Sequence, residues 1–196
     1  PLPRRKLYEK VPLLDCFTAP CKGGCPIQQD IPEYIELCRK GEYASALRLI
    51  TEKNPLPFIT GTICAHRCQT KCTRNYYDDP VQIRATKLIA AEKGYDDLMA
   101  SLKKPEPVTD GRKAAIIGGG PTGIAAAYFL GRAGIPVTVF EQSHKLGGVP
   151  RLVIPGFRIS EEAIEKDIAL MRFYGAAVKL NTPAPSVSEL KAMGYT

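Results

Sequence analysis

The sequence predicts an α+β protein in which a cysteine-rich α-helical domain precedes a partial α/β domain of the Rossmann type. All seven cysteines fall within the first 72 of 196 residues. Amphipathic helical patterns dominate up to about residue 102, and short apolar strands alternate with helices after residue 113. The Pro- and charge-rich stretch KKPEPVTDGRK separates these patterns. We therefore predict domains at 1–105 and 113–196, joined by a linker at 106–112.

Three helices are expected in the first domain. The side-chain oxygen of Asp30 should cap the first helix, which should end at Gly41. Its apolar face would consist of Ile31, Ile35 and Cys38. Standing apart from the other cysteines, Cys38 is predicted to be a small buried hydrophobe rather than a ligand. Further helices are expected at about 42–53, ended by Asn54-Pro55, and at about 83–102.

The second domain should form a parallel sheet with helical crossovers. Apolar runs predict strands at 114–117, 137–140 and 177–180. Helices are expected between and after them, at 121–133, 160–174 and 186–193. This alternation of strand and helix is the organisation of a nucleotide-binding α/β fold.

A glycine-rich motif stands between the first expected strand and the helix that follows it. The run GGGPTG reads G-x-G-x-x-G and contains Gly118, Gly120, Pro121, Thr122 and Gly123. The first glycine permits a tight turn, the second lets the backbone approach a pyrophosphate, and the third lets the helix pack on the sheet. The helix amino-terminus then offers N–H groups and positive dipole to the anion. We therefore predict dinucleotide binding.

Two features after the motif favour FAD over NAD. Glu141 ends the second strand 23 positions after Gly118, where a carboxylate can accept hydrogen bonds from the adenosine ribose. Gly147 and Gly148 then resemble the second glycine pair of many flavoproteins. The alternative is that this pair belongs to an ordinary loop.

Six cysteines form two groups. The first cysteine group is Cys16, Cys21 and Cys25, and the second is Cys64, Cys68 and Cys72. Loop thiolates at these spacings can reach different irons of a cuboidal cluster, whereas structural zinc usually shows C-x2-C pairs. An iron–sulfur site is therefore favoured, with zinc or unliganded thiols as alternatives. His66, inside the second group, is either an alternative ligand or a loop residue near the site.

Composition excludes several other classes. The net charge of +7 is dispersed and is not interleaved with aromatics, which argues against nucleic-acid binding. No apolar run approaches the roughly 18 residues of a membrane span. Clustered thiols without an export signal indicate a reducing compartment, and we expect the cytoplasm. His66 and His144 form no catalytic constellation, so no catalytic residue is assigned. Because the chain lacks an initiator Met, we expect an amino-terminal excerpt of a larger protein.

The motifs together resemble a known family. From Cys16 to Arg84 the chain is similar to the amino-terminal iron–sulfur domain of the glutamate synthase small (beta) subunit, which dihydropyrimidine dehydrogenase shares. The likeness is strongest to the selenate reductase branch, and it continues through GGGPTG and LGGVPRLVIPGFRIS. It implies a flavoprotein oxidoreductase in which NAD(P)H reduces FAD, and FAD passes electrons through one or two [4Fe-4S] clusters to another redox subunit or domain. The NAD(P)H-binding domain would follow later in the polypeptide, so the fragment alone should be inactive.

The chain departs from the family pattern at two ligand positions. Leu13 replaces a cysteine of the first group, and Lys87 stands where the family has Gln or Glu. Six candidate ligands remain for clusters that would need eight. Either one cluster is lost, or Asp15, His66 or water completes the set, or the metal chemistry has decayed. The alternative function is therefore a partner-docking module with a structural metal or none.

Overall fold

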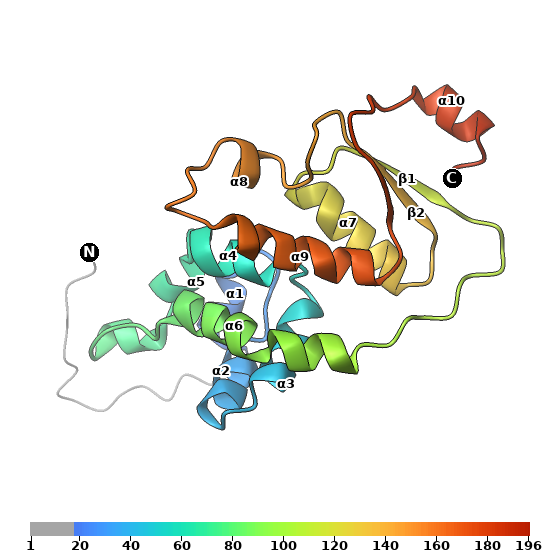
Figure 1. The fold of residues 1–196 in the computed structure, drawn as a ribbon. Coiled ribbons are helices and arrows are strands. Elements are labelled where there is room, and N and C mark those ends of the chain that lie inside the picture. The colour runs from blue at the N-terminus through green and yellow to red at the C-terminus, as the bar shows by residue number, and fades with distance from the viewer. Residues whose placement is uncertain (1–17) are drawn as a thin grey trace. The chain divides into compact units, whose positions relative to one another are not determined.

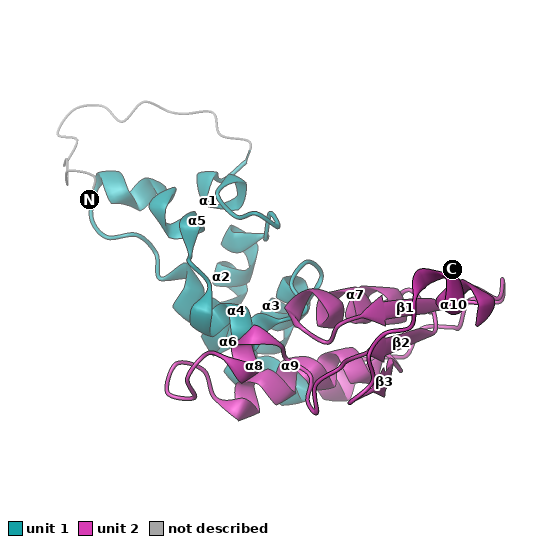
Figure 2. Ribbon diagram, turned by 90° about the horizontal axis from the view of Figure 1, so that it is seen from above, with its two compact units in different colours: residues 1–98 teal, residues 99–196 magenta. Residues whose placement is uncertain are grey.

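The computed structural model describes residues 18–196 and separates into two compact units, the first ending at Leu98 and the second beginning at Met99 (Figure 2). Leu13, Asp15 and Cys16 lie outside the described residues. The predicted linker at 106–112 remains a prediction. Within residues 18–196, none of the helices has the length and apolar character needed to cross a bilayer.

The described part of the first unit is helical. In chain order its elements are α1 (Pro20–Gly23), α2 (Ile31–Arg39), α3 (Tyr43–Thr51), α4 (Pro57–Ile63), α5 (Arg67–Thr70), the 3-10 turn η1 (Thr73–Tyr76) and α6 (Ile83–Ser101). The three predicted helices are confirmed as α2, α3 and α6 (Figure 1). The shorter helices were not predicted, and α1 and α5 each carry a cysteine of one group.

An apolar core among the described residues holds these helices together and reaches the second cysteine group. Its buried members are Ile31, Tyr34, Ala46, Ile50, Cys68, Ile83 and Ala90. Ile35 and Cys38 pack against this core while remaining half-buried, as the apolar face of α2 predicts. Helix α6 approaches α3 closely, because a Cβ on Gly94 would lie 2.4 Å from the carbonyl oxygen of Tyr43.

The predicted role of Asp30 as a side-chain cap is wrong. Asp30 stands at the N-cap of α2 but makes no capping hydrogen bond. Its carboxylate instead pairs with the ammonium groups of Lys22 and Lys53, the latter at 2.6 Å. Charge-assisted contacts to two cations are stronger than a bond to a neutral N–H, so the carboxylate turns away from the helix end. Gly41 ends the helix region as predicted, with a φ of +82°.

The second unit contains a three-stranded parallel sheet in the order β1-β2-β3. The strands are β1 (Ala114–Ile117), β2 (Val137–Phe140) and β3 (Ala177–Lys179), all at predicted positions. The helices are α7 (Pro121–Arg132), α8 (Val149–Leu152), α9 (Glu161–Phe173) and α10 (Val187–Ala192), of which only α8 was not predicted. In the register of the sheet, Phe140 pairs with Ile117 on one side and Lys179 on the other.

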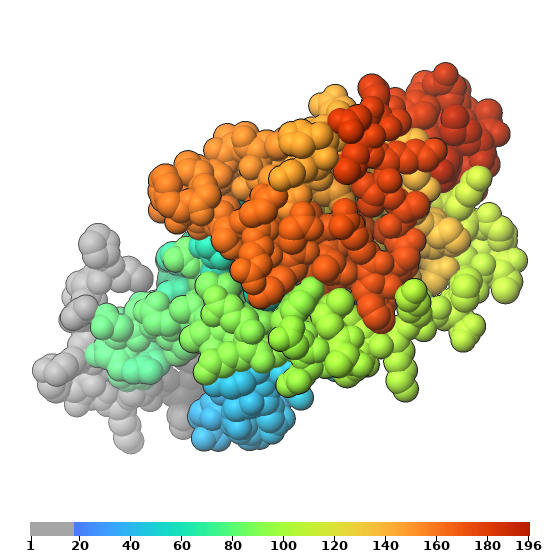
Figure 3. Space-filling view, in the orientation of Figure 1, coloured from blue at the N-terminus to red at the C-terminus, as the bar shows by residue number. Residues whose placement is uncertain are grey.

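Helix α7 packs against β1, β2 and α9, and this contact forms the core of the second unit (Figure 1). Ile124, Val139, Ile168 and Met171 are all fully buried there. By contrast, the segment around α8 lies on the surface in the space-filling view, drawn in orange (Figure 3). Val149, Val153 and Phe157 are 60%, 70% and 87% exposed, so this segment presents apolar side chains to its surroundings.

Candidate functional site

The glycine-rich loop between β1 and α7 requires glycine for steric reasons. Gly118 has a φ of +93°, and its N–H donates to the carbonyl oxygen of Phe140 at 2.8 Å. A Cβ on Gly123 would lie 1.9 Å from the carbonyl oxygen of Gly118, so helix and loop can approach only without that side chain. Gly120 is the N-cap of α7 and supplies no side-chain cap, while Pro121 and Thr122 form the first turn. The amino-terminus of α7 therefore keeps N–H groups that can bind an anion.

Glu141 braces this loop from the end of β2. Its carboxylate is 7% exposed and accepts the Gly119 N–H at 2.6 Å and the Ser143 N–H at 2.7 Å. Burial acts to raise the pKa of Glu141, but these two N–H donors outweigh it, so the pKa lies below its usual value. The carboxylate is therefore charged at neutral pH. Each of its oxygens has a second lone pair that a ribose hydroxyl could use.

The second glycine pair lies against the first glycine-rich loop. The N–H of Gly147 donates to the carbonyl oxygen of Gly119 at 2.8 Å. A Cβ on Gly148 would lie 2.9 Å from the Cα of Gly120, and both Gly147 and Gly148 have positive φ angles. The two loops thus meet backbone to backbone. The structure brings together all the sequence-predicted residues of the dinucleotide site.

A hollow beside Glu141 extends this region. It is lined by Ile117, Gly118, Phe140, Glu141, Gln142 and Ala184. Ile117 is 60% exposed at the carboxyl end of β1 and offers an apolar surface there. In parallel α/β sheets, ligands bind beyond the carboxyl ends of the strands, where this hollow lies.

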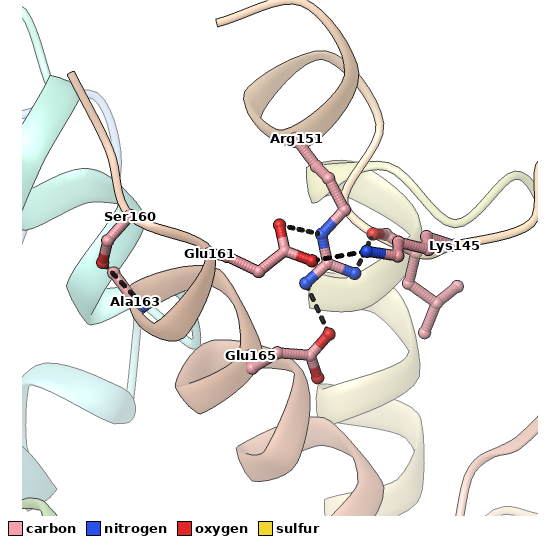
Figure 4. Close-up of polar contacts among 7 residues, drawn as sticks. Lys145, Arg151, Ser160, Glu161, Ala163 and Glu165 are labelled. Atoms are coloured by element: carbon pink, nitrogen blue, oxygen red, sulfur yellow. Dashed lines mark hydrogen bonds and ion pairs between the residues drawn. The ribbon is translucent and has the colours of Figure 1, made fainter. Parts of the chain in front are cut away.

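Arg151 holds the second glycine loop in place, and the sequence analysis missed it. Its side chain is only 4% exposed, and its Nη1 donates to the carbonyl oxygen of Leu146 at 2.7 Å. Its Nη2 donates to the Glu165 carboxylate at 2.5 Å (Figure 4). Its Nε lies 3.2 Å from a carboxylate oxygen of Glu161, which forms an ion pair but not a hydrogen bond. Lys145 adds a 2.9 Å contact to Glu161. The arginine thereby ties the loop before Gly147 to the first turns of α9.

The start of α9 is itself well defined. Ser160 is its N-cap, and its Oγ accepts the Ala163 N–H at 3.1 Å (Figure 4). Glu161 and Glu162 occupy the first turn, where negative charge is favoured by the helix dipole. The role of Arg151 could have been predicted from the sequence, because this arginine follows the second glycine pair by three residues and precedes a helix that begins with Glu161 and Glu162.

In the first unit the two cysteine groups meet. Helix α1, which contains Cys21, packs against α5, which contains Cys68. A Cβ on Gly24 would lie 3.4 Å from the Cα of Cys68 and 2.8 Å from the Cγ of Lys71. Segments more than forty positions apart in sequence are thus in direct contact.

Thiols of the two cysteine groups affect one another's pKa. Burial raises the pKa of Cys21, and Cys72 raises it further. Burial also raises the pKa of Cys68, and Cys25 and Cys64 add to the effect.

Cys38 differs from Cys21 and Cys68 in the cause of its pKa shift. Burial alone raises its pKa, with no contribution from another thiol. This agrees with its predicted role as an apolar residue. Within residues 18–196, no three His, Cys, Asp or Glu side chains converge closely enough to hold one metal ion together. The thiols are nevertheless soft donors on two packed loops, which is the donor chemistry that iron–sulfur clusters use.

Three further residues act on Cys64 or Cys68. Lys87 is 8% exposed on α6, and its charge lowers the pKa of Cys68 against the effect of burial. Arg84 donates from Nη1 to the carbonyl oxygen of Cys64 at 3.0 Å. His66 begins α5 with a φ of +42°, and its backbone N–H lies 3.4 Å from the Cys64 sulfur. The departure from the family pattern at Lys87 therefore falls directly beside the thiols.

The fold and these two sites define the class: an iron–sulfur domain followed by a Rossmann-like nucleotide-binding segment. Residues 9–97 match the protein-family model described as dihydropyrimidine dehydrogenase domain II, 4Fe-4S cluster. Residues 116–161 match the NAD(P)-binding Rossmann-like domain. The predicted fold class and the predicted resemblance are confirmed.

Particular relatives extend this similarity across the chain. YgfK of Escherichia coli strain K12, which is named as an oxidoreductase, is 45% identical over 196 residues, covering 100% of the chain and 19% of YgfK. The NADPH-Fe(3+) oxidoreductase subunit beta of Geobacter sulfurreducens is 34% identical over 86% of the chain and 25% of its own length. The glutamate synthase [NADPH] small chain of Mycobacterium tuberculosis is 35% identical over 83% of the chain and 33% of its own length. The chain therefore spans only a fifth to a third of these relatives.

Proposed function

We propose that the chain is the electron-transfer portion of a larger NAD(P)H-dependent oxidoreductase that carries FAD and [4Fe-4S] clusters. The proposal rests on one observation: a single chain contains two glycine-rich loops in backbone contact and two cysteine groups whose helices α1 and α5 pack together. Named oxidoreductases and oxidoreductase subunits among the relatives support it. The protein would bind and orient the carriers, while their electronic chemistry belongs to the cofactors.

FAD would lie across the two glycine loops of the second unit. The assigned residues are Gly118, Gly120, Pro121, Thr122, Gly123, Glu141, Gly147 and Gly148. The α7 amino-terminus would receive the pyrophosphate, and Glu141 the ribose hydroxyls. The second glycine pair favours FAD over NAD. Its backbone contacts Gly120 of the first glycine loop, so both loops could contact a longer cofactor. When bound, FAD would supply a carrier that takes two electrons as one hydride and releases them one at a time.

Substitution of Gly120 tests this assignment. Gly120→Val places a branched side chain beside Gly148, whose Cα already lies 3.9 Å from a Cβ at that position. We expect FAD affinity in the longer protein to fall at least tenfold, measured by flavin fluorescence titration. Unchanged FAD affinity in a folded variant would show that this glycine loop does not bind the flavin cofactor.

The metal ligands would be Cys16, Cys21, Cys25, Cys64, Cys68 and Cys72. These six thiolates would hold one or two [4Fe-4S] clusters, and Cys16 among them lies outside the described residues. A cuboidal cluster held by cysteine alone uses four thiolates, so six thiolates are two fewer than two such clusters need.

Activity would require the rest of the polypeptide. NAD(P)H would bind to a later domain, so the fragment alone would be inactive, and electrons would leave to another redox subunit or domain. The exposed apolar side chains around α8 support this, since uncovered apolar surface commonly marks an interaction site. The thiol-rich composition favours the cytoplasm.

The anaerobic visible spectrum of the purified chain, recorded before and after dithionite, tests the proposal. We expect broad absorbance that bleaches on reduction, together with acid-labile sulfide. A featureless spectrum that persists after reconstitution with iron and sulfide would instead favour the partner-docking module, in which Leu13 and Lys87 mark the loss of cluster ligands.

A further inference from the structure

Helix α4 ends at the second cysteine group, and a helix end leaves backbone groups without partners. Cys64 is the C-cap residue of α4, with a φ of −60° and a ψ of 138°. The last carbonyl oxygens of a helix have no N–H partner within that helix, and the negative end of the helix dipole lies there. The carbonyl oxygen of Cys64 therefore favours a cationic donor from another element.

Arg84 supplies that donor from the first turn of α6. Its Nη1 donates to the carbonyl oxygen of Cys64 at 3.0 Å, across 20 positions of sequence. The Arg84 side chain is half-buried, so this hydrogen bond is partly shielded from water. On its other side, Cys64 accepts the backbone N–H of His66 at its sulfur, at 3.4 Å. Cys64 is thus held at both its carbonyl oxygen and its sulfur.

The backbone of Arg84 makes a second contact, to α5. Its N–H belongs to the first turn of α6, where N–H groups have no partner within the helix. The side-chain Oε1 of Gln69 accepts it at 3.3 Å. Gln69 directly follows Cys68 in α5, so this bond holds the helix that contains Cys68. Arg84 therefore connects the end of α4, helix α5 and the start of α6.

Two neighbouring residues extend this arrangement. Ile83, which precedes Arg84, is 3% exposed and belongs to the same apolar core as Cys68. Asn75 donates from Nδ2 to the carbonyl oxygens of Gln69, at 2.8 Å, and Cys72, at 2.9 Å. The backbone around all three cysteines of the second group is thus held by side chains that are not themselves thiols.

We propose that Arg84 is a positioning residue for the second cysteine group. Its guanidinium fixes Cys64, while its backbone N–H, through Gln69, fixes the helix that contains Cys68. A guanidinium has five donors and no lone pair, so Arg84 acts through the backbone of the cysteines and not as a ligand. The inference deepens the proposed iron–sulfur function, on which its functional meaning rests.

Alkylation of individual cysteines in the reduced, anaerobically purified chain tests this proposal. Peptide mapping after treatment with iodoacetamide gives the reaction rate of each thiol. Arg84→Met removes the guanidinium and keeps an apolar stem. We expect Cys64 to react about fivefold faster, the factor that corresponds to the loss of one ordinary hydrogen bond. The rate at Cys38, which packs against the same core, should stay unchanged.

Two further variants serve as rescue and control. Arg84→Lys keeps a cation that can donate to the carbonyl oxygen of Cys64, and it should restore most of the wild-type rate. Arg67→Met removes an exposed cation from α5 and should leave the rates at Cys64 and Cys38 unchanged.

Each other outcome would overturn the proposal. An unchanged rate at Cys64 in a folded Arg84→Met variant would show that the guanidinium does not position this residue. Equal acceleration at Cys64 and Cys38 would show that Arg84 only stabilises the core. If Arg84→Met does not fold, Gln69→Leu decides, because loss of the acceptor for the Arg84 N–H should accelerate alkylation of Cys68, and an unchanged rate there would contradict the proposal. Iron and acid-labile sulfide in the same samples test the proposed function separately, so the two failures are distinguishable.

Discussion

The two candidate sites are built by opposite means. In the second unit, the glycine loops are closed by backbone hydrogen bonds, by Glu141 and by Arg151, so the protein itself completes the site. In the first unit, burial raises the pKa of Cys21 and Cys68, which disfavours bare thiolates there. The proposed nucleotide site is therefore held by the protein's own hydrogen bonds, whereas the cysteine loops would gain stability from the proposed metal centre.

Removing iron should produce the largest difference in stability between the two units. With the proposed clusters extracted by a chelator under reducing conditions, we expect α2, α3 and α5 to lose hydrogen-exchange protection. The loss should be on the order of several kcal/mol, because metal binding and folding are coupled in small metal domains. Helices α7 and α9 should keep their protection. An equal loss of hydrogen-exchange protection in both units would contradict the proposed difference between the two sites.

Within the second unit, Gly123→Ala should be the most damaging single change. The new Cβ would lie 1.9 Å from the Gly118 carbonyl oxygen, so helix α7 must shift away from the loop. We expect a destabilisation of about 3 kcal/mol or more, measured by denaturant unfolding. Gly156→Ala is the matched control, since nothing lies within 4 Å of its Cβ position. Similar losses in both variants would contradict the steric argument.

Arg151→Met should destabilise the second unit less than Gly123→Ala does. The variant removes the donor to Leu146 while keeping an apolar stem, and the half-exposed Glu161 and Glu165 can be hydrated. We expect a loss of about 1–2 kcal/mol and faster hydrogen exchange at the Gly147 N–H. Arg158→Met, at an exposed position of the same segment, should have little effect. If exchange at Gly147 is unaltered, Arg151 does not hold the loop.

The smallest expected effect concerns pH. Because hydrogen bonding holds the pKa of Glu141 below 4.5, its charged form stabilises the folded second unit. This contribution, about 1 kcal/mol, is complete above pH 4.5 and is lost as pH falls through the lowered pKa of the folded state. Glu141→Gln should remove that part of the acid dependence. Thermal unfolding between pH 3 and 7 measures it, and parallel curves for the two proteins would contradict the assignment.

The regular elements of both units could be predicted because their patterns are local. Strand 114–117 is a continuous apolar run, strand 137–140 is apolar apart from Thr138, and α6 begins at its predicted residue. The helices α1 and α5 have four residues each, too few to show a periodic pattern.

The contacts that sequence reasoning missed depend on distant partners. Asp30 was expected to cap α2, but Lys53, which is 23 positions away, takes its carboxylate. Arg151 acts through Glu165, 14 positions later. The glycines of the nucleotide loop were identified because their steric requirement is set by neighbouring residues. The contact between the two cysteine groups was not, since it requires the packing of α1 on α5.

That packing also sets the order of events during synthesis of the chain. Cys21 and its neighbour Cys72 are 51 residues apart (72 − 21), so a ribosome needs about 3–10 s to travel from one codon to the other at typical speeds. During that interval the early thiols have emerged without the loop that packs against them. They are open to oxidants and to stray metal ions. Loading of the proposed clusters would therefore follow translation of the second cysteine group, and oxidative stress should damage nascent chains more readily than finished ones.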